Sequence, residues 1–251
     1  MTFTELDSQR VGGEHANFVD ALPFVWNKFE QVGYVTLYAE DGLIAGGGDT
    51  FHTDFHGFEQ VPVHHYMRPF WQAAADLGAV ERTGVHRTGC LGTLPEYTYV
   101  FRYVEQFLSD SRGSRGVSYP AHVPRFAFAS VSGSADGGDP SSLARFDHDL
   151  SSWLEDLRRS GVLERTAVVV VGDHGPSYGA RRQTVLGKTE ERLPLLVVSV
   201  PTWFAQQQPE MMRNLVANSD RLVTPLDLHQ TLLALLDATD SVAQVGLLDN
   251  T

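Results

Sequence analysis

The sequence predicts an α/β domain with a mainly parallel sheet flanked by helices. Short apolar runs of strand length alternate along the chain with longer stretches whose apolar residues recur at helical spacing. That alternation favours parallel strands joined by helices that cover both faces of the sheet. The chain has 251 residues, 42% of them hydrophobic, which is enough for one large core or two small ones. We interpret residues 1–251 as a single domain.

Local signals place the elements of the amino-terminal half. A helix is predicted over residues 22–31, and Gly33 is well placed to end it. Residues 34–39 are predicted to form a strand, which leads into a loop rich in Gly and His over residues 42–65. A second helix is predicted from Thr93, because a capping residue and an early proline precede apolar residues at helical spacing.

The carboxyl-terminal half continues the same alternation. Strands are predicted over residues 125–131, 167–171 and 195–200, and a helix over residues 141–159. A further helix is predicted to begin at Thr224, because a proline and a carboxylate follow in its first turn. The expected buried side of the 141–159 helix consists of Leu143, Phe146, Leu150, Trp153, Leu154 and Leu157.

The most informative residues follow the apolar run at 167–171. Asp173 and His174 come directly after it, so the strand delivers a carboxylate and an imidazole to its carboxyl end. Open α/β sheets bind ligands in the crevice at that edge. An Asp oxygen and a His nitrogen together suit zinc or a similar divalent ion, although a polar turn that caps the next element is the alternative. Four cations follow within residues 181–192, in a chain of formal net charge -12, which fits an anionic substrate group.

A run further along resembles a known family. Residues 187–194 read Gly-Lys-Thr-Glu-Glu-Arg-Leu-Pro and, with the strand and Asp173-His174-Gly175, are similar to the alkaline phosphatase/sulfatase superfamily. The resemblance is closest to an uncharacterised sulfatase-like family, and it spans residues 20–236. Other matching segments are Pro23 to Asp41, Gly57-Phe58, Arg68-Pro69-Phe70, Gly161-Val162-Leu163, Leu222 to Pro225 and Asp227 to Leu232.

This resemblance implies a fold, a cofactor and a substrate class. It implies that Asp173 and His174 are two ligands of a catalytic divalent metal ion, which could be zinc, calcium or manganese. Arg181, Lys188 and Asp136 are the expected contacts to the substrate. The implied substrate is a small-molecule or glycan-borne sulfate or phosphate ester, and the implied location is extracellular or in the secretory pathway.

The same resemblance also points to missing parts. The first strand of the sheet, its metal-binding acid and the nucleophile are expected before the segment that begins at Pro23, where only about twenty residues stand. The histidine expected in the loop after the 125–131 strand is replaced by Ser134. The chain is thus expected to be a partial domain without turnover, prone to self-association through a vacant sheet edge. Two alternatives are a non-catalytic binding or scaffold domain that kept the fold, and an incomplete gene product.

The resemblance also fixes an expected geometry. Asp173 and His174 should lie at the carboxyl end of a central parallel strand. Its expected neighbours in the sheet are the strands over 34–39, 125–131 or 195–200.

Several other polar residues are given structural interpretations. The histidines at 52, 56, 64 and 65 are expected to be solvated loop residues, together with Asp54. For Lys188 and Arg192, contact with a sulfate or phosphate oxygen competes with ion pairs to Glu190 and Glu191. Glu40-Asp41 is interpreted as a helix cap or as part of a site. His229 is interpreted as a core or capping residue, and Cys90 as a buried, inert thiol.

Composition excludes several classes of protein. The 31 acidic residues outnumber the 19 basic ones, which argues against a general nucleic-acid surface. No apolar run of about 18 residues exists, so no transmembrane helix is predicted. The residues after Met1 lack the basic and apolar regions of a secretory signal. With a single cysteine, the chain cannot form an internal disulfide.

Overall fold

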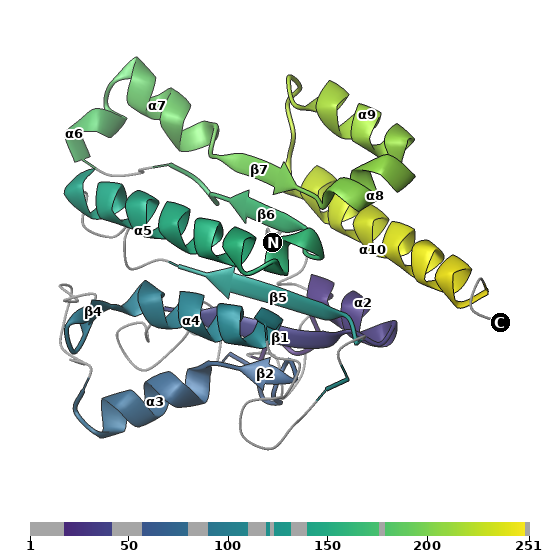
Figure 1. Cartoon of the computed structure of the whole chain (residues 1–251). Helices are drawn as coiled ribbons and strands as arrows, with labels where there is room; N and C mark the ends of the chain where they lie inside the picture. The colour runs from purple at the N-terminus through teal and green to yellow at the C-terminus, as the bar shows by residue number, and fades with distance from the viewer. Residues whose placement is uncertain are drawn as a thin grey trace.

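Helices flank a small parallel sheet in a mixed α/β architecture (Figure 1). This computed structural model describes residues 18–41, 57–79, 90–109, 119–120, 123–131, 140–175 and 179–248. The parallel sheet is formed by residues 35–130, and the residues after position 130 hold a separate pair of strands and most of the surrounding helices.

The parallel sheet has three strands in the order β2-β1-β5. Its central strand β1 (Val35–Glu40) is buried along its whole length. It pairs with β5 (Arg125–Ser130) over six residues, from Val35 opposite Arg125 to Glu40 opposite Ser130. The short strand β2 (His65–Tyr66) pairs with its other edge. A strand buried on both faces needs an apolar run, which explains why the sequence around Leu37 predicts it well.

Helices cover this sheet and extend beyond it. Helix α2 (Val25–Gln31) precedes β1, and α4 (Glu96–Ser109) lies over the sheet with a buried apolar face that includes Val100 and Val104. A short antiparallel pair of strands, β3 (Cys90–Leu91) and β4 (Leu94–Pro95), leads into α4. The remaining helices are α3 (Arg68–Asp76), α5 (Pro140–Arg159), the 3-10 turn η3 (Val162–Glu164), α6 (Gly179–Arg182), α7 (Val185–Arg192), α8 (Thr202–Gln207), α9 (Pro209–Asn218) and α10 (Pro225–Leu248).

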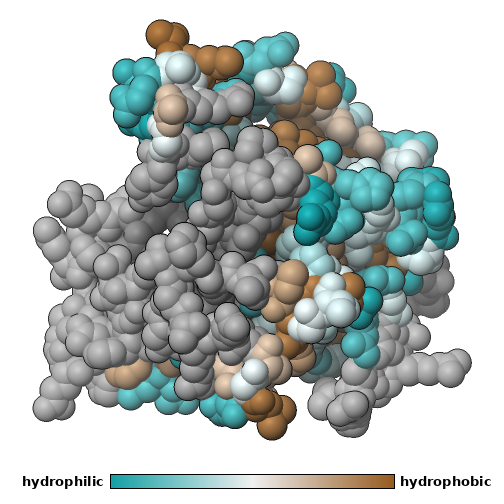
Figure 2. All heavy atoms as spheres, turned by 90° about the vertical axis from the view of Figure 1, so that its left-hand side faces the viewer, coloured by the Kyte–Doolittle hydropathy of each residue, from teal (hydrophilic) through white to brown (hydrophobic). Residues whose placement is uncertain are grey.

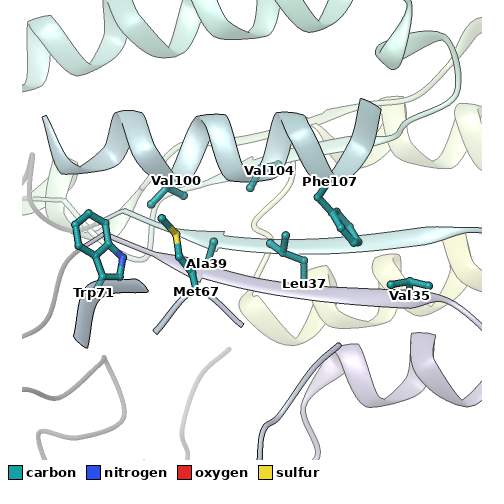
Figure 3. Packing of buried hydrophobic residues seen from close by; sticks show 8 residues of the cluster. All are labelled: Val35, Leu37, Ala39, Met67, Trp71, Val100, Val104 and Phe107. Atoms are coloured by element: carbon teal, nitrogen blue, oxygen red, sulfur yellow. The ribbon is translucent and has the colours of Figure 1, made fainter. Parts of the chain in front are cut away.

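The main hydrophobic core lies between α4, α3 and β1 (Figure 3). Leu37, Trp71 and Val100 are fully buried there, and the side chains of α4 point toward those of the sheet. A second cluster on the other side of β1 is aromatic: Trp26 stacks on Phe24 at 4.3 Å and on Tyr38 at 5.4 Å between ring centroids. Both clusters draw their members from residues before position 68 or from α3 and α4, so the amino-terminal half carries the packed interior.

The position of the 167–171 strand differs from the expectation. Strand β6 (Val168–Val171) pairs antiparallel with β7 (Leu196–Ser199), and within the described ranges these two strands form a sheet of their own. The prediction that this strand is parallel and central in the main sheet is therefore wrong. Helices α6 and α7 form the connection from β6 to β7 and turn the chain back on itself. The amide of Gly172 donates to the carbonyl oxygen of Leu195 at 2.9 Å, which extends the ladder to the base of this connection.

Side-chain exposure is the second departure. The apolar runs of β6 and β7 predict burial on both faces, yet Val171 is 52% and Val197 45% exposed. Figure 2 faces the side on which α6 and α7 lie in Figure 1, and hydrophobic side chains reach the surface at the top of that view, at the height of α7. On α5, Leu157 is buried as predicted, whereas Leu143 is 56% exposed. Helical spacing identifies the face of a helix but not how far its partner extends along it.

Several helices were not predicted. Residues 68–76 form α3 with Pro69 in its first turn, and the segment interpreted as a polar loop after Asp173 contains α6 and α7. No helix in the described part of the chain is both long and apolar enough to cross a lipid bilayer.

Candidate functional site

The candidate site centres on the turn Asp173–Gly175, which follows β6 directly. The side chain of Asp173 is 87% exposed and that of His174 is 60% exposed. The backbone amide of His174 donates to Asp173 Oδ1 at 2.8 Å, which fixes the carboxylate beside the imidazole. The second carboxylate oxygen, Asp173 Oδ2, lies 3.6 Å from His174 Nε2. The two polar atoms thus face the same region of solvent from one end of the strand.

The hydrogen bonding of His174 sets its tautomer. Its Nδ1 lies 2.8 Å from the carbonyl oxygen of Gly175, and because a carbonyl only accepts, Nδ1 carries the hydrogen. The neutral ring therefore presents the lone pair of Nε2 to solvent, which is the arrangement typical of metal-binding histidines. Two ligands of one tetrahedral zinc ion lie about 3.4 Å apart, given metal–ligand bonds of about 2.05 Å. The spacing of 3.6 Å between Nε2 and Oδ2 fits a shared ion.

Helix α7 holds this turn through backbone contacts. The amide of Gly175 donates to the carbonyl oxygen of Glu191 at 3.1 Å. A Cβ atom on Gly175 would come within 2.6 Å of the Glu190 carbonyl carbon and closer still to its oxygen. Only glycine therefore allows the turn to lie directly against the helix backbone.

Residues 182–191 contain most of α7 and an ion pair that links this helix to α6. Thr184 caps α7, and its hydroxyl oxygen accepts the amide of Gly187 at 2.9 Å. Arg182 Nε lies 2.8 Å from Glu191 Oε2. That oxygen is buried and no N–H of the described residues points at it, so its contact with Arg182 is an ion pair without an aligned hydrogen bond. Glu191 thus supports the site twice, through its backbone oxygen to Gly175 and through its carboxylate to Arg182.

The expected substrate contacts are only partly described. Lys188 lies on α7 with an exposed side chain, and Arg192 is exposed at the end of the same helix. Arg181 lies in α6, but its side chain falls outside what the structure describes, and so does Asp136 as a whole. Glu191 was expected to compete with a substrate anion for Lys188 or Arg192. The ion pair that the structure describes for Glu191 is with Arg182.

Asp173 and His174 by themselves would supply two ligands to a metal ion. Within the described ranges, no three His, Cys, Asp or Glu side chains gather closely enough to hold an ion. Two ligands make half of a tetrahedral coordination sphere, and such a half-site binds metal weakly.

The other polar residues singled out in the sequence fall into two groups. His64 and His65 are not free loop residues: His65 lies in β2 and its Nε2 atom is buried, while His64 Nδ1 lies 3.0 Å from Thr36 Oγ1. His229 is half-buried in α10, and Cys90 is a half-buried free thiol in β3. The histidines at 52 and 56 and Asp54 lie outside the described residues.

The acidic pair Glu40-Asp41 lies at the carboxyl end of β1, and both residues are buried. Tyr38 donates its hydroxyl to Glu40 Oε2 at 3.0 Å, and the indole of Trp71 donates to the Glu40 backbone oxygen. The sequence left open whether these acids cap a helix or belong to a site. The sequence does not reveal that both acids are buried at the end of a strand, and this burial is the information needed to choose between the two roles.

Comparison with known families gives one match. The profile of a family described as protein of unknown function (DUF229) matches residues 2–246. No curated protein matches the chain. No solved structure matches it either.

Proposed function

The chain belongs to the family described as protein of unknown function (DUF229), and on that premise we propose that it is a metal-dependent hydrolase domain for sulfate or phosphate esters. Asp173 and His174 are the proposed metal ligands. Arg181, Lys188 and Asp136 are the proposed contacts to the substrate anion. The observation that carries this proposal is the spacing of 3.6 Å between Asp173 Oδ2 and Nε2 of the exposed His174 ring.

Each group has a defined task in this proposal. The Gly175 carbonyl oxygen holds the His174 ring in the tautomer that leaves Nε2 free, and the His174 amide orients the Asp173 carboxylate. Zinc, calcium or manganese, when bound, would polarise an oxygen of the ester. The Lys188 ammonium on α7 would attract the anion, because α7 lies directly against the turn. The proposed substrate is a small-molecule or glycan-borne ester, and the proposed location is the secretory pathway or the cell exterior.

A non-catalytic binding domain is the second candidate. It is favoured by the two-ligand site, because within the described ranges no Ser, Thr or Cys side chain hydrogen-bonds to Asp173 or His174. In that case the turn would hold a metal or an anion without turnover.

Zinc-dependent binding of an aryl phosphate and an aryl sulfate tests the proposal. We expect the chain to bind one of the two more tightly with zinc present, to lose this enhancement in Asp173→Ala, and to show no hydrolysis above background. Turnover that disappears in Asp173→Ala would reveal a nucleophile and replace the expectation of inactivity. Ester binding that zinc does not change would overturn the proposed function.

A further inference from the structure

We propose that His64 and His65 make the β2 edge of the parallel sheet a pH-sensitive contact, which holds β2 and α3 on β1 while both rings are neutral and releases them in mild acid. The inference concerns the sheet edge alone and does not depend on the function of the turn at Asp173. It rests on the surroundings of the two imidazole rings.

The ring of His65 occupies an aromatic pocket. It packs against Phe107 of α4 at 5.2 Å and against Tyr119 at 5.6 Å between ring centroids. Its Nε2 atom is buried, and no described residue forms a hydrogen bond with it. A neutral imidazole tolerates this pocket because one nitrogen can remain a buried acceptor at modest cost, whereas an imidazolium would bury an N–H donor and a charge together.

His64 adds a second requirement for neutrality. Its Nδ1 accepts from the Thr36 backbone amide at 3.3 Å and lies 3.0 Å from the Thr36 hydroxyl oxygen. The His64 amide in turn donates to that hydroxyl oxygen at 3.3 Å. Thr36 is fully buried in β1. A proton on Nδ1 would remove the acceptor for the Thr36 amide, so this contact between β1 and the residue before β2 also needs a neutral ring.

The charges around His65 oppose its protonation. Burial lowers the pKa of His65 below 6.5, and the neighbouring His64 and the cationic Arg125 of β5 lower this pKa further. Tyr119 contributes a phenol against the ring, and α4 contributes Phe107, which carries no charge. Because the folded protein prefers the neutral ring, the unfolded or released segment binds the proton more readily. The stability of the contact is therefore fully present well above pH 6.5 and declines as the pH falls below that value.

Release of β2 would reach the carboxyl end of β1. The strand is only two residues long, and its register pairs are Leu37 with His65 and Tyr38 with Tyr66. The next amide, of Met67, donates to the Tyr38 carbonyl oxygen, and the Trp71 indole of α3 donates to the Glu40 carbonyl oxygen. Acid release of this short strand would thus loosen α3 and uncover the end of β1 where Glu40 and Asp41 are buried.

Hydrogen–deuterium exchange of the full chain, followed by mass spectrometry, tests this proposal. Peptides that cover residues 58–79 are compared with peptides from α4 between about pH 5 and pH 7.5, after correction for the intrinsic exchange rate. We expect the opening of the 58–79 peptides to increase below pH 6.5, by up to about tenfold per pH unit for one linked proton. The α4 peptides should change much less over the same range.

Variants separate the two histidines from general acid effects. His65→Phe should abolish most of the pH dependence because it keeps an aromatic ring in the pocket. His64→Asn, which retains an acceptor for Thr36, should weaken it, and the exposed His148→Asn on α5 is the matched control that should leave it unchanged. Protection of residues 58–79 that does not change with pH, or an unchanged pH dependence in His65→Phe, would overturn the proposal.

The ring resonances of the wild-type protein give a readout that does not require a variant to fold. We expect His65 to titrate below 6.5 in step with the loss of protection. A His65 ring that titrates while residues 58–79 stay protected would also overturn the proposal.

Discussion

Similar apolar sequences are mostly buried in residues 18–160 and more often exposed in residues 161–248. Of the 25 buried hydrophobic residues in the described ranges, 21 lie before residue 161, whereas 12 of the 17 exposed large hydrophobic residues lie after it. Strand β1 is buried throughout, while the equally apolar β7 is mostly exposed. The amino-terminal region therefore carries most of the packing energy, and the candidate site stands on the region with the more open strands.

This difference shows what an apolar strand sequence does and does not determine. The run over residues 167–171 correctly predicts a strand, because four consecutive valines favour extended backbone. It does not determine the partner strand or the burial, which depend on what the rest of the chain brings alongside. Burial would require a further layer on β6 and β7, and within the described ranges the side chains of β6 are mostly half-buried and those of β7 mostly exposed.

A matched pair of truncations tests this comparison with the largest expected effect. Leu37→Ala in β1 removes a fully buried side chain, and we expect a loss of about 2–5 kcal/mol in the free energy of unfolding. Leu196→Ala in β7 removes a side chain that is 38% exposed, and we expect a loss below about 1 kcal/mol. Urea denaturation of both variants measures the difference. Equal losses would mean that Leu196 is buried in solution and that the two regions do not differ.

A substitution at the turn sharpens the comparison within the open region. Gly175→Ala would force its Cβ into the Glu190 backbone, and we expect a cost of about 1–3 kcal/mol, mostly as increased hydrogen exchange in α7. Gly172→Ala is the matched control, because its Cβ would meet the Pro194 Cβ at 3.3 Å and needs only a small shift. Similar exchange in the two variants would show that α7 does not rest on the turn.

The link between α4 and α5 predicts a smaller effect. The Tyr97 hydroxyl donates to Asp149 Oδ2 at 2.7 Å, and Phe101 stacks on Trp153 at 4.7 Å. Tyr97→Phe keeps the ring contacts and removes the hydrogen bond, so we expect a loss of about 1 kcal/mol in thermal or urea unfolding, together with increased hydrogen exchange in α5. Tyr99→Phe, which removes a hydrogen bond to the Leu91 backbone oxygen away from α5, serves as a control. An increase in α5 exchange in Tyr99→Phe but not in Tyr97→Phe would contradict this assignment.

The exposed strands also predict association in solution. Apolar side chains on β7 and α7, such as those of Val197 and Leu186, should favour contacts between molecules as the concentration rises. Light scattering should show a concentration-dependent mass that Val197→Lys reduces, with the exposed Leu77→Lys on the other region as a control. A monomer at every concentration would leave these side chains without a role in self-association.

The sequence predicts the elements of this molecule better than their arrangement. The strand at Leu37 and the 141–159 helix were identified because apolar spacing is a local property. The antiparallel pairing of β6 was missed because direction depends on how α6 and α7 turn the chain, and these helices contain glycine and many polar residues. The buried nitrogen of His65 was missed because a two-residue strand leaves almost no pattern to detect.

In the candidate site too, contacts between adjacent residues could be predicted from the sequence, whereas contacts between distant residues could not. Adjacent positions in the sequence guarantee that Asp173 and His174 lie close together, and their hydrogen bonds give them a shared orientation. The pairing of Arg182 with Glu191 joins residues nine positions apart across two helices, so no local pattern could have identified it. Metal binding and the contacts of Arg181, Lys188 and Asp136 remain predictions.

Zinc titration of the full chain, by calorimetry and by the ring-nitrogen signals of labelled histidines, tests the central claim that Asp173 and His174 form half of a metal site. We predict that zinc shifts Nε2 of His174 while Nδ1 stays protonated, and that Asp173→Asn with His174→Gln weakens binding by about tenfold or more. The matched control changes Asp147 and His148, an identical pair of neighbours on α5, in the same way and should leave the affinity unchanged. Zinc binding that survives the change at Asp173 and His174, or that falls equally in the control, would contradict the account.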